Sequence, residues 1–244
     1  MAVPFLDLKK QYSTIKEEID ARIADVLQNC NFIMGPNVAA FEKELAAYLN
    51  ARNAITCASG SDALLLALMA LGIKEGDEVL TTPFTFFATA GAIARLNATP
   101  VFADIDGRTF NIDPASAVKK MTCRTKAVIA VHLYGQAADL APLLKAAAEN
   151  KAAVIEDCAQ AIGARYENKP VGTIGDIGCL SFFPTKNLGC YGDGGAVIAA
   201  NDEISEKIKI LRVHGAKPKY FHKFIGINSR LDEIQAAVLR VKLK

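Results

Sequence analysis

Short apolar segments alternate along the chain with longer amphipathic segments. Strands are predicted for Ala54–Cys57, Glu78–Thr82, Thr99–Ala103, Ala127–Val131, Ala152–Glu156, Gly178–Phe182 and Ala196–Ala199. Helices are predicted for Ser13–Gln28, Val38–Leu49, Asp62–Leu71, Thr85–Leu96, Asp139–Glu149 and Asp202–Arg212. Strands such as Val128–Val131 are apolar on both faces, which is typical of a sheet covered on both sides by helices. The pattern therefore predicts a three-layer α/β/α domain with a mainly parallel, seven-stranded sheet.

The last predicted helix starts at Leu231 and runs to Lys244, with no Gly or Pro stop signal after it. We expect either that this helix is the final element or that the chain is a fragment of a longer protein. The chain contains no internal repeat, low-complexity tract or long linker. Residues 1–244 are therefore expected to form one large domain that includes an N-terminal helical segment.

Composition and charge narrow the class of protein. The 244 residues, of which 51% are hydrophobic, suffice for one large domain or two small ones. A formal net charge of +2 is close to neutral, and without a basic arm or an acidic tail nucleic acid is not an expected partner. Six cysteines are scattered without a Cys-x-x-Cys pair, which favours reduced thiols in a cytoplasmic protein.

No targeting or membrane segment is predicted. The residues from Met1 to Asp7 lack the basic region and long apolar core of a signal peptide. The longest apolar run, Ala63–Leu71, is shorter than the roughly 20 residues that a helix needs to cross a bilayer. We expect no membrane association.

The segment Ser181–Gly189 carries the most informative residue, Lys186, between a predicted strand and a glycine-rich turn. Its compact and mostly apolar setting favours the neutral amine, because desolvation disfavours the ammonium form. A neutral lysine is a nucleophile that forms a Schiff base with an aldehyde. The alternative is a surface lysine on a turn, which is the common environment of this residue type.

Three further motifs follow predicted strands, at the edge where parallel α/β sheets bind ligands. The first is Ser59–Asp62, where free N–H groups and the dipole of the following helix favour a phosphate group. The alternative is an ordinary helix N-cap formed by Ser61 or Asp62.

The other two motifs supply an acid and an aromatic ring. In Val154–Gln160, Asp157 suits a protonated pyridine nitrogen and Gln160 suits a phenolic oxygen, although a strand-end Asp also commonly caps the next turn. In Thr82–Thr89, an aromatic side chain is placed to stack on a planar ring, although core packing is the commoner role of phenylalanine. Together the motifs provide an amine, an acid, an aromatic ring and a phosphate site, which is what pyridoxal phosphate requires.

The motifs together resemble those of the DegT/DnrJ/EryC1/StrS family of pyridoxal-phosphate-dependent nucleotide-sugar aminotransferases. The resemblance covers essentially the whole chain and is carried by Phe5–Leu8, Ser59–Ala63, Val131–Gln136, Glu156–Gln160, Ser181–Leu188, Gly192–Gly195 and Asn228–Ala237. It implies the aspartate-aminotransferase fold, fold type I. In the family the chain continues past the position of Lys244 into a smaller C-terminal domain, which we expect to be missing from residues 1–244.

The resemblance also implies a role for each site residue. Lys186 is the catalytic, Schiff-base lysine, Asp157 pairs with the pyridine nitrogen, and Gln160 contacts the ring hydroxyl. The phosphate is held by Gly60, Ser61 and Ser181, and Phe86 stacks on the ring. The family commonly has Thr in place of Ser61, which preserves the hydroxyl.

Two further positions concern the neighbouring subunit and the substrate. Asn228 matches a residue that serves the phosphate site of the neighbouring subunit, which implies a homodimer with shared active sites. Arg230 and His214 are weaker candidates for contacts with the sugar, and His222 is a further histidine of that region. His132 follows a buried strand and is interpreted as structural, and no metal site is expected.

The implied reaction transfers an amino group from an amino acid, normally glutamate, to a keto-sugar nucleotide in surface-polysaccharide or deoxyaminosugar biosynthesis. The presence of Lys186 argues against the dehydratase branch, which lacks this lysine. The segments Arg212–Gly215 and Lys219–His222 resemble the branch that acts on 3-keto UDP- or dTDP-sugars. The alternatives are a 4-keto substrate, a non-catalytic regulatory relative, or a lyase that acts on an amino acid with the same cofactor.

Overall fold

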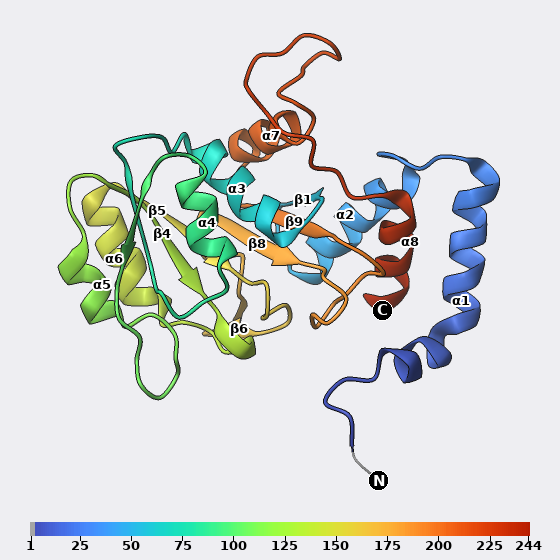
Figure 1. The fold of residues 1–244 in the computed structure, drawn as a ribbon, viewed down its shortest axis with the longest axis horizontal. Helices are drawn as coiled ribbons and strands as arrows, with labels where there is room; N and C mark the ends of the chain where they lie inside the picture. Colours follow the sequence, from blue (N-terminus) through green and yellow to red (C-terminus); the bar gives the residue numbers. More distant parts are fainter. Residues whose placement is uncertain (1–2) are drawn as a thin grey trace.

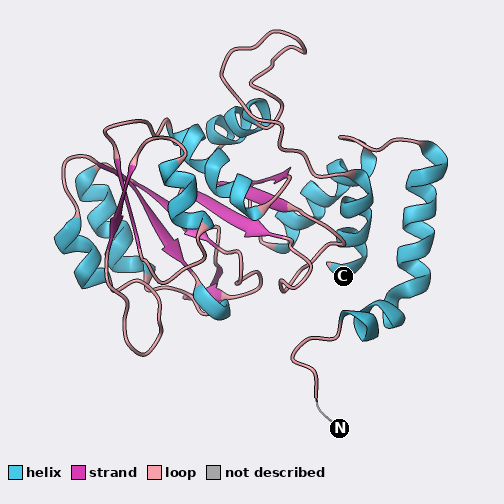
Figure 2. Cartoon of the chain, in the orientation of Figure 1, coloured by secondary structure: helices cyan, strands magenta, loops and turns pink. Residues whose placement is uncertain are grey.

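The computed structural model describes residues 3–244, so the Met1–Ala2 part of the N-terminal expectation lies outside the described residues. Its centre is a seven-stranded sheet in the order β1-β9-β8-β5-β4-β2-β3 (Figures 1 and 2). The strands are β1 (Asn53–Cys57), β2 (Glu78–Thr81), β3 (Thr99–Phe102), β4 (Thr125–Val131), β5 (Ala153–Asp157), β8 (Ile177–Ser181) and β9 (Gly195–Ala199). All seven predicted strands are present.

Only β9 breaks the parallel arrangement of the sheet, since it pairs antiparallel with both β1 and β8. The pairs β2–β3, β2–β4, β4–β5 and β5–β8 are all parallel. Since β1 and β8 are each antiparallel to β9, they run in the same direction as one another. The C-terminal ends of six strands therefore meet at one edge of the sheet, where ligands bind in folds of this class.

Helices cover both faces of the sheet, which confirms the three-layer prediction (Figure 2). The helices are α1 (Leu8–Asn29), α2 (Pro36–Tyr48), α3 (Gly60–Leu71), α4 (Ala88–Ala94), α5 (Pro114–Lys120), α6 (Leu140–Asn150), α7 (Asp202–Leu211) and α8 (Glu233–Lys242), with a 3-10 turn η1 (Leu133–Gly135). Alternate residues of a strand point to opposite faces. Thus Val197 packs in the core with α3, α4 and α7, and Ile198 packs in the core with α2 and α8.

Helices α5, α6 and α1 and one projecting loop complete the domain around the sheet. Helices α5 and α6 pack on the face of β2 and β4 opposite to α3, where Val128 and Leu143 share a core. Helix α1 lies outside the three layers and contacts α8 through Ile19 and Val238 (Figure 1). The loop from Ala216 to Gly226 projects from the body of the domain next to α7.

Several elements differ from the sequence-based expectation. The predicted helix Thr85–Leu96 shortens to α4 because a bend at Thr85 and a turn at Phe87 precede the helix and a turn begins at Arg95. Helix α5 was not predicted since its seven residues are too few to show a period, although Asp113 caps it with two hydrogen bonds and Pro114 starts it. A small ribbon of β6 (Arg165–Tyr166) and β7 (Lys169–Pro170) was also missed. Within residues 3–244, no helix is both long and apolar enough to cross a membrane.

Candidate active site

A cavity of about 330 Å³ opens at the edge of the sheet where the parallel strands end, within the usual size range of ligand pockets. Seven of the predicted site residues line it: Gly60, Ser61, Phe86, Asp157, Gln160, Ser181 and Lys186. They come from four separate segments of the chain, and only the fold brings them together. Asn228, Arg230 and His214 do not line this cavity.

The start of α3 forms one wall of the cavity. Ser59, in extended conformation, caps the helix by accepting a hydrogen bond from the Asp62 N–H at 3.1 Å. The expectation that Ser61 or Asp62 is the cap is therefore wrong, because the helix already begins at Gly60. A helix leaves its first N–H groups without intrahelical partners, so this wall offers donors to an anion.

Gly60 has a steric reason to be glycine. A Cβ atom built on it would lie 2.6 Å from Cβ of Ser181, which is closer than real Cβ contacts come. The absence of this atom lets the start of α3 approach the end of β8. As a result, Ser61 and Ser181 line the same cavity as the helix N-terminus.

Asp157 lies at the C-terminal end of β5 and is only 5% exposed. Its Oδ2 accepts a hydrogen bond from the Thr89 hydroxyl at 3.0 Å, and its Oδ1 accepts one from the Ala159 N–H at 3.1 Å. Burial raises the pKa of Asp157, although these hydrogen bonds and the charge of Lys186 act in the opposite direction. A buried carboxylate of this kind is best satisfied by a cationic donor in the cavity, such as a protonated ring nitrogen.

Gln160 is fixed by the backbone of the turn after β4. Its Oε1 accepts a hydrogen bond from the Tyr134 N–H at 2.8 Å. This bond defines the amide orientation, because a backbone N–H requires an oxygen as its partner. The amide NH₂ group thus remains as a donor, which suits a phenolic oxygen.

Lys186 lies in the loop Phe182–Gly194 between β8 and β9, and we call this segment the lysine loop. The side chain is half-buried and lines the cavity. Its backbone N–H donates to the Phe183 carbonyl at 2.8 Å. The position therefore combines partial burial with access to the cavity, in contrast to a lysine on an open turn.

Phe86 borders the cavity with 72% of its surface exposed. Core packing therefore does not explain this residue. The aromatic ring is available to cover a planar ligand. Nearby, the Phe84 and Phe110 rings are tilted against each other with centroids 5.7 Å apart.

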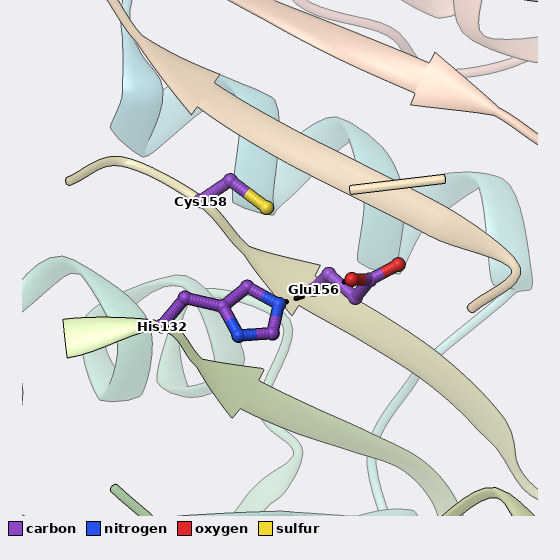
Figure 3. A group of neighbouring side chains, drawn as sticks. All are labelled: His132, Glu156 and Cys158. Atoms are coloured by element: carbon purple, nitrogen blue, oxygen red, sulfur yellow. Dashed lines mark hydrogen bonds and ion pairs between the residues drawn. The ribbon is translucent and has the colours of Figure 1, made fainter. Parts of the chain in front are cut away.

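A buried hydrogen-bond network joins His132 to Glu156, the residue before Asp157 (Figure 3). His132 is fully buried, and its Nδ1 accepts a hydrogen bond from the Ala138 N–H at 2.9 Å. The hydrogen of its imidazole must then be on Nε2, which lies 3.0 Å from Glu156 Oε2 and donates to it. The location of His132 agrees with the structural role predicted for it.

Glu156 connects this histidine to the backbone. It accepts hydrogen bonds of 2.7 Å from each of the N–H groups of Gly172, Ile174 and Gly175. Burial acts to raise the pKa of Glu156. His132 and these N–H groups outweigh that effect and hold the pKa below its ordinary value.

With Cys158, His132 and Glu156 have the spacing of a metal-ligand cluster (Figure 3). However, each Glu156 oxygen already accepts two hydrogen bonds, and both imidazole nitrogens are engaged. Burial also raises the pKa of the Cys158 thiol well above its usual value. We therefore interpret the cluster as a hydrogen-bond network.

Thr89 and Glu156 were missed by the sequence-based reasoning. Thr89 is separated from Asp157 by 68 residues, and nothing in its local sequence indicates the contact. Glu156 did carry a signal, since a carboxylate within the apolar strand Val154–Asp157 requires buried partners.

The three remaining predicted residues lie on the segment that follows α7. Val213 and Asn228 pair as an isolated bridge, and Asn228 is exposed. The adjacent Ser229 is buried, and its Oγ accepts a hydrogen bond from the Ala58 N–H at 3.0 Å. Asn228 thus lies near the segment that leads to Gly60, but outside the cavity, and His214 is exposed at the base of the projecting loop.

Comparisons with known proteins place the chain among sugar aminotransferases. The sequence model of the DegT/DnrJ/EryC1/StrS aminotransferase family matches residues 13–244. A relative named pleiotropic regulatory protein, from Geobacillus stearothermophilus, is 54% identical over 99% of this chain and 65% of its own length. UDP-2-acetamido-2-deoxy-3-oxo-D-glucuronate aminotransferase from Pseudomonas aeruginosa is 47% identical over 99% of this chain and 67% of its own length.

The fold agrees with solved structures. The crystal structure of S. venezuelae DesV, in complex with ketimine intermediate, superposes with a TM-score of 0.96 at 45% identity. It matches 99% of this chain and 65% of the DesV chain. The chain thus spans about two thirds of the length of these proteins.

Proposed function

The chain belongs to the DegT/DnrJ/EryC1/StrS aminotransferase family, and on that premise we propose that it transfers an amino group from an amino acid to a keto-sugar nucleotide with pyridoxal phosphate as cofactor. The observation that carries this proposal is the joint lining of one cavity by Lys186, Asp157 and the N-terminus of α3. These groups match the aldehyde, the ring nitrogen and the phosphate of the cofactor.

The residues present fit the cofactor at each of its polar groups. Ser61, Ser181 and the first N–H groups of α3 would hold the phosphate, in a space that exists because Gly60 lacks a side chain. Asp157 would hold the ring nitrogen in its protonated form, and the Gln160 amide would donate to the ring oxygen. When bound, pyridoxal phosphate supplies an electron sink that makes the α-proton of an attached amino acid acidic.

Lys186 has two tasks in this proposal. Its Nζ would hold the cofactor at the aldehyde carbon until an amino acid donor is bound. The freed Nζ takes the proton from the donor α-carbon as a general base and returns a proton as a general acid. The exposed ring of Phe86 would shield the cavity from water while the proton is moved.

The substrate proposed is a 3-keto UDP- or dTDP-sugar, with L-glutamate as the donor, in surface-polysaccharide or deoxyaminosugar biosynthesis. The Pseudomonas relative, whose name specifies a 3-oxo UDP-sugar, supports this choice over a 4-keto sugar. Supplying purified protein with matched 3-keto and 4-keto sugar nucleotides distinguishes the two substrates. A preference for the 4-keto sugar would contradict the assignment of the keto position while preserving that of the reaction.

A homodimer with shared active sites is also proposed. Five aromatic side chains are exposed on the segments that border the cavity: Phe84, Phe86, Phe87, Tyr134 and Phe183. The exposed ring of Phe110 lies against that of Phe84. A group of exposed aromatic residues of this kind favours contact with another protein surface. Exposed Asn228, near the start of α3, would then reach the phosphate site of the second copy. The free thiols of the described chain support a reducing, cytoplasmic location.

The Geobacillus relative, named as a regulatory protein, keeps a second candidate open. A regulator that binds pyridoxal phosphate without turnover would need the phosphate site but not a competent Lys186. One experiment separates the two functions: the loaded protein is mixed with glutamate, and loss of the visible cofactor band and release of 2-oxoglutarate are recorded. If the protein is the proposed enzyme, the wild type loses the visible band and releases 2-oxoglutarate, and Lys186→Ala does neither. A stable band with glutamate would support the regulatory role.

A further inference from the structure

The lysine loop is closed by the backbone at its base. The Phe182 N–H donates to the Gly194 carbonyl, and the Cys190 N–H donates to the Phe182 carbonyl, both at 2.8 Å. Beyond this base, Lys186 lies at the outer part of a 13-residue excursion between β8 and β9. The Lys186 N–H bond to the Phe183 carbonyl holds the outgoing half of the loop, and the returning half depends on contacts with other elements.

Helix α8 supplies those contacts through Gln235. Its Oε1 accepts a hydrogen bond from the Tyr191 N–H at 2.8 Å, and its Nε2 donates to the Tyr191 carbonyl at 3.2 Å. One side-chain amide thus holds both polar groups of a single backbone residue, five positions after Lys186. A Cβ atom on Gly192 would lie 2.9 Å from Gln235 Nε2, so the glycine at this position allows the amide to approach.

A second residue of α8 adds to this support. Lys242 Nζ donates to the Gly189 carbonyl at 2.7 Å and lies 4.6 Å from the ring centroid of Tyr191. The returning half of the lysine loop is therefore attached to α8 at two residues. Neither contact involves the cavity itself, so both act on Lys186 only through the loop.

The segment before Gln235 makes separate contacts with other parts of the fold. Ser229 accepts a hydrogen bond from the Ala58 N–H, next to the cavity wall formed by the start of α3, which we call the phosphate wall. Glu233 accepts hydrogen bonds from the Asn37 and Val38 N–H groups at the start of α2. Each of the three side chains thus binds the backbone of a different distant segment. Of these three side chains, Gln235 is the one bonded to the lysine loop, which separates its role from that of Ser229.

We propose that Gln235 is a positioning residue that holds the lysine loop so that Lys186 reaches the cofactor aldehyde. This inference rests on the proposed function. The step it assists is the attack of Lys186 Nζ on the aldehyde carbon, in which a C–N bond forms and water leaves. If the loop is not held, the free lysine samples other positions, and the bond forms less readily while the phosphate and ring sites stay intact.

The test is a double-mutant cycle on cofactor affinity. The dissociation constant of pyridoxal phosphate is measured for the cofactor-free forms of wild type, Gln235→Met, Lys186→Ala and the double variant. Losing two hydrogen bonds should raise the dissociation constant roughly tenfold when Lys186 is present. In the Lys186→Ala background, the same substitution should change it less than about twofold, because the lysine bond is already absent.

Two controls set the scale of this effect. Gln28→Met makes the same substitution on the exposed surface of α1 and should change neither affinity nor thermal unfolding. Ser229→Ala acts beside the phosphate wall and should weaken binding by similar factors in both backgrounds. If Gln235→Met does not fold, Gln235→Glu keeps the acceptor for the Tyr191 N–H, and its dissociation constant should be raised only when Lys186 is present.

A second readout is the rate of covalent capture. Borohydride treatment after mixing, followed by peptide mass analysis, reports how fast Lys186 becomes attached. Slower capture in Gln235→Met with an unchanged unfolding temperature supports the positioning role. Equal effects of Gln235→Met in both backgrounds, or none in either, would overturn it. If wild type and Lys186→Ala bind equally well, the proposed function itself fails, and the inference fails with it.

Discussion

The Thr89 hydroxyl offers a direct test of how Asp157 is held. Thr89 Oγ1 donates to Asp157 Oδ2 at 3.0 Å, and the two residues are only 1% and 5% exposed. Thr85 Oγ1 lies 3.0 Å from Thr89 Oγ1, and if Thr89 donates to the carboxylate, Thr85 is the donor to Thr89. Thr89→Val keeps the shape of the side chain and removes this donor.

The size of the effect follows from the charge on the acceptor. A hydrogen bond to an ionised group contributes about 1.5–3 kcal/mol, which corresponds to about a 10- to 150-fold change in an equilibrium constant. Some of this will be lost from the stability of the apoprotein, whose unfolding temperature should fall by roughly 2–4 °C per kcal/mol for a chain of this size. The rest should appear as weaker binding of pyridoxal phosphate.

The pH dependence gives the sign of the change. Burial raises the pKa of Asp157, while the Ala159 N–H, the Thr89 hydroxyl, His132 and Lys186 lower it. The buried thiols of Cys158 and Cys179 are further titratable groups close to this carboxylate. Removing the hydroxyl raises the pKa of Asp157 further. Since only ionised Asp157 pairs with a protonated ring nitrogen, cofactor affinity falls as the pH falls through this pKa. In Thr89→Val that fall begins at a higher pH.

The assay is a titration of apoprotein with pyridoxal phosphate at a series of pH values, followed by absorbance. Thr89→Ser should restore both the affinity and the pH midpoint because it restores the donor. Thr85→Val, one hydroxyl further from the carboxylate, should have a much smaller effect. If Thr89→Val binds the cofactor with the affinity and pH midpoint of wild type, the hydrogen bond does not control Asp157 and the reasoning is refuted.

Three other substitutions test separate parts of the site. Gly60→Ala would put a Cβ 2.6 Å from Ser181 Cβ and should weaken pyridoxal phosphate binding by at least about tenfold. If the affinity is unchanged and inorganic phosphate competes as well as in wild type, the phosphate site is not close-packed. Phe86→Leu should weaken cofactor binding by about 2- to 10-fold through lost stacking without moving the unfolding temperature, since the ring is 72% exposed; a loss of stability would instead indicate a packing role. Glu156→Gln should cost about 1–3 kcal/mol of unfolding free energy in urea titrations near neutral pH. The pKa of Glu156 is lowered in the fold, so its contribution to stability is present above the unfolded pKa and is lost as the pH falls through the folded pKa. If Glu156→Gln costs the same unfolding free energy in acid as near neutral pH, the ionic role is contradicted.

The strand pattern was predictable from the sequence because strands buried on both faces leave continuous apolar runs, such as Ala127–Val131. Site residues at strand ends, such as Asp157 and Ser181, were predictable for the same reason. Thr89 was not, since its partner is 68 residues away and its local sequence is that of an ordinary helix. The cap of α3 was placed at Ser61 or Asp62 instead of Ser59, because three neighbouring polar residues are all suitable caps and the sequence does not choose between them.

The single antiparallel strand explains how a lysine so close to β8 in sequence comes to lie beside the ends of the parallel strands. In a parallel pair, the chain must cross from one edge of the sheet to the other before the next strand begins. Because β9 instead returns antiparallel, with Ser181 opposite Gly195, the lysine loop both leaves and re-enters the sheet at the cavity edge. A Cβ on Gly195 would lie 2.4 Å from the Ser59 carbonyl carbon. The residue before α3 and the start of β9, directly after the lysine loop, are therefore packed backbone against backbone. The spacing between the start of α3 and the base of the lysine loop is thus set by the sheet, whereas the position of Lys186 beyond that base also depends on the contacts of α8.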